Sequence, residues 1–216
     1  TMKIVECPRD AMQGIKHWIP SELKIKYINQ LLNVGFDTLD FGSFVSPKAI
    51  PQLKDTEQVL NGLDLSDTKS KLLAIVANER GALDACRFEE IQFLGYPFSI
   101  SEEFQKRNTN ASIEESLSRV EAIQNLCLKH KKELVIYISM GFGNPYGEQW
   151  SPDIAAHWSN RLATELDVKI LALSDTIGVS NPENISSLFS TLIPEFPKVE
   201  FGAHLHSIPE TRMEKI

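Results

Sequence analysis

Short apolar runs alternate with amphipathic segments along almost the whole chain. Residues 71–77 (KLLAIVA) are nearly all apolar, which is typical of a strand buried on both faces of a parallel sheet. The same pattern predicts seven strands, at residues 2–7, 36–41, 71–77, 90–94, 134–139, 169–173 and 199–204. The chain is therefore expected to be a series of β-α units.

Helical spacing of apolar residues fills most of the segments between these strands. It predicts helices at residues 21–34, 56–63, 80–87, 112–130, 152–166 and 182–192, with another beginning at Pro209. Ser21 after Pro20 is the expected cap of the first of these helices, and Gly35 is its expected stop. Residues 112–115 (SIEE) fit a capping box at the start of the longest one.

Two α/β architectures fit seven such units, a doubly wound sheet and a TIM (β/α)8 barrel. A doubly wound sheet would be expected to carry a glycine-rich phosphate turn after its first strand, and none is present. A barrel places its polar site residues just past the carboxyl ends of its strands. Such residues lie at or just past the ends of the predicted strands here: Arg9, Asp10, Gln13, Asp40, Ser43, Asn78, Ser139, Asp175, Thr176, His204 and His206. We therefore predict a single TIM-barrel domain over residues 1–216. Because no eighth strand is visible, we expect the C-terminal unit to be missing from this chain or the barrel to be open.

Composition and charge narrow the classes of function. A length of 216 residues suits one domain with a large core, and a formal net charge of −7 argues against general nucleic-acid binding. The longest apolar run is too short to span a membrane, and no signal peptide precedes the first strand. The three cysteines are odd in number and lack metal-ligand spacing, so a reducing cytoplasm is expected.

The strongest candidate for a catalytic metal site combines residues from the two ends of the sequence. Asp10 follows the first predicted strand, and His204 and His206 lie at the end of the seventh. Residues i and i+2 of an extended segment point the same way, so both imidazoles can reach one divalent metal ion. Arg9 stands beside the carboxylate, and a metal with a guanidinium suits chemistry that builds negative charge on an oxygen. The alternatives are a structural ion pair between Arg9 and Asp10 and two histidines satisfied within the core.

Five segments, in this order, resemble the 3-hydroxy-3-methylglutaryl-CoA lyase family, which belongs to the metal-dependent lyase TIM barrels. They are residues 8–13 (PRDAMQ), 42–48 (GSFVSPK), 108–116 (NTNASIEES), 174–179 (SDTIGV) and 202–206 (GAHLH). The resemblance extends over almost the whole chain, and the second segment favours the lyases over the related synthases. It implies cleavage of 3-hydroxy-3-methylglutaryl-CoA to acetoacetate and acetyl-CoA, and through it leucine breakdown or ketone-body formation.

The resemblance also implies roles for individual residues. Asp10, His204 and His206 would bind Mg²⁺ or Mn²⁺, and Arg9 would stabilise the enolate of acetyl-CoA. Asp40 and Asp175 would position or deprotonate the substrate hydroxyl, although Asp40 could instead hold Arg9 and Asp175 could cap a turn. The expected substrate-binding residues are Gln13, Ser43, Lys48 and Asn108. Lys106 and Arg107 are further candidates for CoA contacts, but solvated surface is the simpler interpretation. We expect a small acyl-CoA as the partner, no nucleic acid, no membrane, and a homodimer or another homo-oligomer.

Several positions depart from the family's pattern. The family usually has a glycine where this chain has Ala11. It often has a glutamate at the position of Asp40 and an aspartate at the position of Ser207. The family's catalytic cysteine and a further metal-binding asparagine would lie beyond Ile216, and none of the three cysteines present matches that cysteine. Two alternatives therefore stay open. One is a related enzyme acting on another 3-hydroxyacyl-CoA or on a 2-oxo acid. The other is an inactive homologue that binds a partner along an exposed edge between the first and seventh strands.

Overall fold

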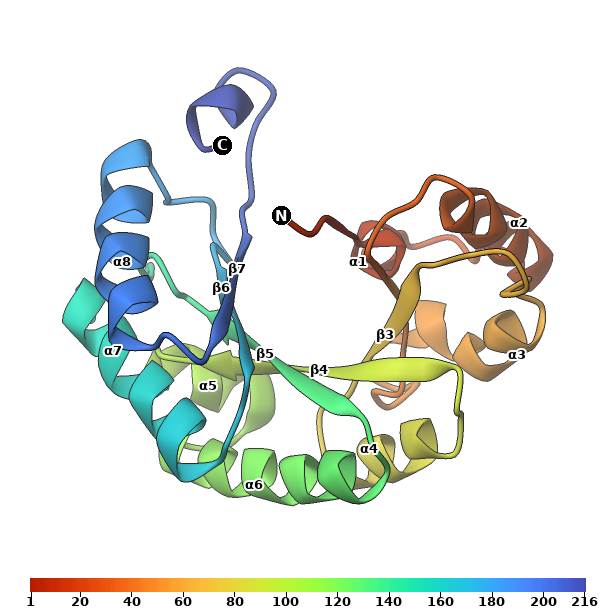
Figure 1. The fold of residues 1–216 in the computed structure, drawn as a ribbon, viewed down its shortest axis with the longest axis horizontal. Helices are drawn as coiled ribbons and strands as arrows, with labels where there is room; N and C mark the ends of the chain where they lie inside the picture. Colours follow the sequence, from red (N-terminus) through yellow and green to blue (C-terminus); the bar gives the residue numbers. More distant parts are fainter. The chain divides into compact units, whose positions relative to one another are not determined.

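A computed structural model describes residues 1–216 as seven parallel strands alternating with helices (Figure 1). The strands follow one another in the sheet in the order β1 to β7. Their bounds are β1 (Val5–Glu6), β2 (Thr38–Ser43), β3 (Lys71–Ile75), β4 (Ile91–Ser99), β5 (Glu133–Ser139), β6 (Ile170–Ser174) and β7 (Glu200–His204). All seven predicted strands are confirmed, although β1 is shorter than expected and β4 runs on through Gly95 and Pro97.

Helices connect the strands. Their bounds are α1 (Pro8–Gln13), α2 (Ser21–Leu32), α3 (Thr56–Asn61), α4 (Glu79–Cys86), α5 (Glu102–Thr109), α6 (Ile113–Lys129), α7 (Pro152–Asn160) and α8 (Pro182–Glu195), with short 3₁₀ helices at Pro51–Leu53 (η1) and Arg212–Glu214 (η3) and a π-helix at Arg161–Glu165 (η2). None of these helices combines the length and apolar character that crossing a lipid bilayer requires.

Several details differ from the sequence-based expectation. The helices α1 and α5 were not predicted, because α1 has only six residues and α5 buries only Gln105. Ser21 does not cap α2: Pro20 takes the cap position, and the Ser21 hydroxyl donates to the Asp55 carboxylate. The helix expected from Pro209 is limited to η3.

The capping box of α6 is confirmed, because Ser112 and Glu115 each accept the other's backbone N–H with a side-chain oxygen.

The chain divides into two compact units. Unit 1 comprises Thr1–Gly95 and Asn125–Glu133, and unit 2 comprises Tyr96–Gln124 and Leu134–Ile216. Each unit holds consecutive parallel strands, and the described registers β1–β2–β3–β4 and β5–β6–β7 are all parallel.

In unit 1, β2 is buried along its whole length, as expected for a strand covered on both faces. A buried lysine supports the helices of this unit: the Lys24 ammonium lies 2.8 Å from Asp55, donates to the Gln52 carbonyl and lies 4.0 Å from the centre of the Trp18 ring. The Gln52 amide in turn donates to the carbonyls of Ile15 and His17. This network fixes the loop after α1 against η1 and α3.

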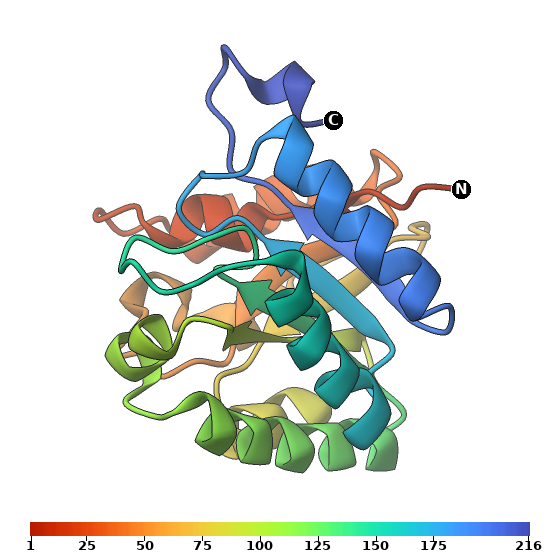
Figure 2. The same ribbon diagram turned by 90° about the vertical axis from the view of Figure 1, so that its left-hand side faces the viewer.

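In unit 2, the inner strands β5 and β6 supply the core, with Ile136, Ile138, Leu171 and Leu173 all buried. Helices α7 and α8 lie side by side, in front of β6 in the view of Figure 2. An Asn181–Asn184 capping box starts α8, and this cap fixes where the loop after β6 ends.

Candidate active site

Arg9 and Asp40 form the central ion pair of unit 1. Arg9 Nε lies 3.1 and 3.2 Å from the two carboxylate oxygens of Asp40, and Arg9 Nη2 lies 2.7 Å from Oδ2. Glu6 of β1 pairs with Leu39 of β2, so Asp40 stands beside the point where β1 passes into α1. Asp40 is fully buried, and the contact of two guanidinium nitrogens with one carboxylate fixes the plane of the Arg9 head group. The geometry matches the expected alternative in which Asp40 holds Arg9.

The short helix α1 arranges the neighbours of Arg9. Pro8 at its first position is favourable there, because its fixed φ suits a helix start. Arg9 Nη1 donates to Gln13 Oε1 at 2.7 Å, as residues four apart on a helix allow, and lies 3.3 Å from Asp10 Oδ1. The Arg9–Asp10 ion pair, which was the alternative to a functional role for Asp10, is thus present, and three predicted site residues (Arg9, Asp10 and Gln13) lie together.

Cys7 directly precedes α1 and is partly buried. Burial, with the negative charge of Asp40, raises the pKa of its thiol to about 12. At neutral pH the group is therefore a thiol and not a thiolate.

Ser43 and Lys48 follow β2 in different environments. The Ser43 hydroxyl accepts the Val45 N–H, and the Ser43 N–H donates to the hydroxyl of Thr56. A Cβ on the preceding Gly42 would lie 2.5 Å from Thr56 Cγ2, so glycine permits this close approach. Ser43 is buried and fixed, whereas Lys48 is exposed and does not join it.

Asp175 is the buried carboxylate of unit 2, directly after β6. It accepts the backbone N–H groups of Val179 and Ser180 at 2.8 and 2.9 Å, while its own N–H donates to the His204 carbonyl at 2.9 Å. This is the turn-capping geometry that was the alternative to a catalytic role. It also places Asp175 beside the end of β7, where Ser174 pairs with His204.

The rings of His204 and His206, at and just past the end of β7, meet edge to face with 5.4 Å between their centres. A ring nitrogen of each lies within 4.8 Å of a ring nitrogen of the other. The Nδ1 of His206 is 3.2 Å from the Thr176 carbonyl, and the His204 ring contacts Tyr137 edge-on with 5.9 Å between ring centres. A proton on Nδ1 of His206 would leave Nε2 as the metal-binding atom, a common arrangement for histidine ligands. The pair fits a divalent metal.

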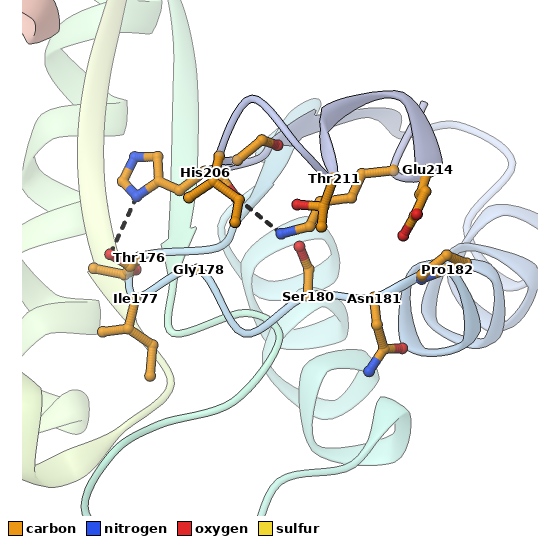
Figure 3. A pocket seen from close by; sticks show the side chains of 12 residues that line it. Thr176, Ile177, Gly178, Ser180, Asn181, Pro182, His206, Thr211 and Glu214 are labelled. Carbon is orange, nitrogen blue, oxygen red and sulfur yellow. Dashed lines mark hydrogen bonds between the residues drawn. The ribbon is translucent and has the colours of Figure 1, made fainter.

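A cavity of about 600 Å³ opens in unit 2 beside these residues. It is lined by the loop after β6, from Thr176 to Pro182, and by the segment from His206 to Lys215 (Figure 3). Lys215 was not identified from the sequence. Its ammonium lies 3.6 Å from Asp175 Oδ2 and donates to the His206 carbonyl at 2.9 Å. No motif marks this lysine, because it meets Asp175 only through the tertiary fold.

The remaining candidates lie on α5. Asn108 and Lys106 are exposed, and neither shows a side-chain contact that marks a binding site. Arg107 pairs with Glu103 and lies 5.0 Å from the centre of the Tyr146 ring. For Arg107 these contacts agree with the surface interpretation. Glu148, in the loop between β5 and α7, fixes that loop to the start of α5. Its carboxylate accepts hydrogen bonds from the Ser101 hydroxyl and the Glu103 N–H.

Comparisons with known proteins place these features in a family. Residues 2–208 match the family described as HMGL-like. The hydroxymethylglutaryl-CoA lyase YngG of Bacillus subtilis is 33% identical over 209 residues, which are 95% of this chain and 68% of that protein. The mitochondrial hydroxymethylglutaryl-CoA lyase of Homo sapiens is 32% identical over 208 residues, 95% of this chain and 62% of that protein. The chain thus spans about two thirds of the length of these relatives.

Solved structures agree. The HMG-CoA lyase of Bacillus subtilis superposes with a TM-score of 0.91 at 31% identity, covering 99% of this chain and 71% of that one. An HMG-CoA lyase of Acinetobacter baumannii, in complex with coenzyme A and 3-methylmalate, gives a TM-score of 0.85 at 27% identity, with 99% and 69% covered. These likenesses confirm the predicted α/β fold of the TIM-barrel type. From the match over residues 2–208, and from its similarity to curated hydroxymethylglutaryl-CoA lyases, we conclude that the chain belongs to the HMGL-like family of carbon–carbon lyases.

Proposed function

We propose that this chain belongs to a divalent-metal-dependent lyase that cleaves 3-hydroxy-3-methylglutaryl-CoA to acetoacetate and acetyl-CoA. The observation that carries the proposal is the pair His204 and His206 at and just past the end of β7, in a chain similar to hydroxymethylglutaryl-CoA lyases over 95% of its length. The family match supports the reaction class, and the side chains described above support the roles below.

Asp10, His204 and His206 are the proposed ligands of Mg²⁺ or Mn²⁺. One carboxylate and two imidazoles suit such an ion, and the sequence motif of residues 8–13 brings Asp10 into the set by its resemblance to the family. The bound ion would supply Lewis-acid polarisation of the substrate's oxygens.

Arg9 is the proposed stabiliser of the enolate. When the substrate's C3 hydroxyl loses its proton, the bond between C2 and C3 breaks, C3 becomes the ketone of acetoacetate, and the bonding electrons pass to the acetyl-CoA enolate. A guanidinium held rigidly near the enolate oxygen lowers the energy of that charge. Asp40 supports this role, because its hydrogen bonds with two guanidinium nitrogens fix the Arg9 head group before substrate binds. The enolate carbon then takes up one proton, which balances the proton lost from the hydroxyl.

Asp175 is proposed to position or deprotonate the C3 hydroxyl. Its carboxylate is held by two backbone N–H groups, so its orientation is fixed, as positioning of a reacting group requires.

Gln13, Ser43, Lys48 and Asn108 are the proposed substrate-binding residues. The Acinetobacter baumannii relative, whose structure holds coenzyme A and 3-methylmalate, supports an acyl-CoA as the ligand class. A single TIM-barrel domain that includes residues 1–216, and a homodimer or another homo-oligomer, belong to the same proposal. Light scattering of the purified protein tests the oligomeric state.

The cytoplasm is the proposed compartment. Three free cysteines and the cytoplasmic relatives of rat and zebrafish support it, although relatives named as mitochondrial also match.

The decisive experiment follows acetoacetate release from 3-hydroxy-3-methylglutaryl-CoA, with the protein expressed from its complete gene. Asp10→Asn and His204→Ala are assayed beside the unchanged protein, each with added Mg²⁺ or Mn²⁺. Metal-dependent cleavage that both substitutions abolish is the expected result. Tight metal binding without cleavage would point to a different acyl-CoA or 2-oxo acid as the substrate. If the protein showed no metal binding and no cleavage, the proposal that it is an enzyme would be rejected.

A further inference from the structure

Lys215 occupies an unusual place for a lysine. Its side chain is only 8% exposed, although lysine is among the residues that are almost never buried without a partner. Its ammonium donates to the main-chain carbonyl of His206 and forms an ion pair with the fully buried carboxylate of Asp175. Figure 3 marks the hydrogen bond to His206 with a dashed line beside the cavity. One cation therefore contacts both loops that carry the proposed site residues of unit 2.

We propose that Lys215 is a positioning residue of the active site, which holds the His206 backbone and the Asp175 carboxylate in the arrangement that metal and substrate require. The inference rests on the proposed function, because it assigns His206 to the metal and Asp175 to the substrate hydroxyl.

The contacts around Lys215 show why it would control geometry. The end of β6 and the end of β7 are joined by two other hydrogen bonds, from Asp175 N–H to the His204 carbonyl and between His206 Nδ1 and the Thr176 carbonyl. Lys215 adds a third connection, through a side chain and not the backbone. Since His206 itself is exposed, this contact to its main chain is one of the few restraints on its position.

Stability alone does not explain a charge at this place. Burying an ion pair costs desolvation energy that the attraction between the charges only roughly offsets, so such pairs add little net stability. Groups that orient metal-binding residues, by contrast, commonly change metal affinity or activity by about tenfold to hundredfold when they are removed. The location of Lys215, beside a proposed ligand and a proposed catalytic carboxylate, fits that second role.

The test uses the protein expressed from its complete gene and compares Lys215→Met with Lys215→Cys. Methionine keeps the apolar stem and removes the charge. The cysteine variant is assayed before and after treatment with 2-bromoethylamine, in which the thiolate displaces bromide and forms a thioether amine nearly isosteric with lysine. Mass spectrometry confirms that the new thiol has reacted. Lys169→Met is the matched control, because Lys169 pairs with Asp167 on the surface of the same unit.

Two readouts are measured on each protein that keeps its circular dichroism spectrum. Mn²⁺ affinity is determined by electron paramagnetic resonance, and kcat and KM are determined for 3-hydroxy-3-methylglutaryl-CoA. We expect Lys215→Met and unmodified Lys215→Cys to weaken Mn²⁺ binding and to lower kcat by about tenfold or more. We expect alkylation of Lys215→Cys to restore most of the Mn²⁺ affinity, which does not depend on the catalytic cysteine that the reagent would also modify, and Lys169→Met to change neither readout.

Mn²⁺ affinity and kcat that stay at the original values in Lys215→Met would overturn the inference, even if its melting temperature fell. Alkylation that adds the amine but restores nothing would overturn it too. If the unchanged protein bound Mn²⁺ but did not cleave the substrate, the proposed function would fail. The loss and recovery of Mn²⁺ affinity would then still decide the role of Lys215.

Discussion

The backbone N–H of Asp175 donates a 2.9 Å hydrogen bond to the carbonyl of His204. This contact continues the β6–β7 register by one residue beyond the Ser174–His204 pair, so the last residue of β7 lies beside the first residue after β6. A carboxylate and an imidazole that stand 29 positions apart in sequence are thereby held at one strand edge. The chemistry proposed for unit 2 depends on this parallel pairing.

The first prediction concerns the partner of Arg9. In Asp40→Asn, the carboxamide keeps the shape of the carboxylate but cannot accept two charge-assisted hydrogen bonds from the guanidinium. We expect kcat for 3-hydroxy-3-methylglutaryl-CoA to fall by about 100-fold with a smaller effect on KM, because enolate stabilisation is lost mainly in the transition state. Steady-state kinetics measure this. The control is Glu103→Gln, which removes the exposed partner of Arg107. Equal kcat in Asp40→Asn and the control would refute the role given to Arg9.

Metal dependence gives the second prediction. Treatment with EDTA, which removes the divalent ion, should abolish cleavage, and added Mn²⁺ should restore it. Without the ion, its ligand residues cannot polarise the substrate. His206→Ala should weaken Mn²⁺ binding by about tenfold or more in calorimetry. His130→Ala, at an exposed histidine outside the predicted site, should leave the affinity unchanged. Binding that persists in His206→Ala would remove this residue from the ligand set.

A third prediction tests the buried pair Lys24–Asp55 of unit 1, whose side chains are 1% and 6% exposed. Asp55→Ala leaves a buried ammonium without its carboxylate, and we expect the free energy of unfolding to fall by about 3–5 kcal/mol. Lys169→Met breaks the exposed pair with Asp167 and should cost less than about 1 kcal/mol. Urea unfolding measures both. The double change Lys24→Met with Asp55→Leu should recover much of the loss, and a double variant as unstable as Asp55→Ala would contradict this account.

The fourth prediction concerns pH and the cysteines. The pKa values of both Cys7 and Cys127 are raised to about 12, chiefly by burial. At a pH between the unfolded and folded pKa values, the folded protein therefore keeps thiol protons that the unfolded chain has lost. Stability from these two groups is therefore complete below pH of about 8.5, the unfolded pKa, and declines as pH rises toward 12. At pH 8, iodoacetamide should modify neither thiol in the folded protein and both in urea, as peptide mass mapping would show. Rapid labelling of Cys7 in the folded protein would disprove its assigned environment.

Much of the fold follows from local pattern. The apolar runs of β3 and β6 and the capping box at Ser112 and Glu115 are short-range signals, and the structure bears them out. Residue type alone does not decide where a helix is capped. Ser21 is a good cap by type, but the buried Asp55 carboxylate binds its hydroxyl, and only the tertiary structure brings Asp55 there.

The sequence by itself determined the α/β class, the order of the strands and the residues able to do chemistry, because apolar periodicity and motif spacing are local properties of the chain. Only the tertiary structure decided which of them meet. Asp40 accepts hydrogen bonds from two guanidinium nitrogens of Arg9 because the β1–β2 register places it there, and Lys215 reaches Asp175 because the segment after β7 folds back over the loop after β6. Such contacts depend on strand register and burial, which no local pattern encodes.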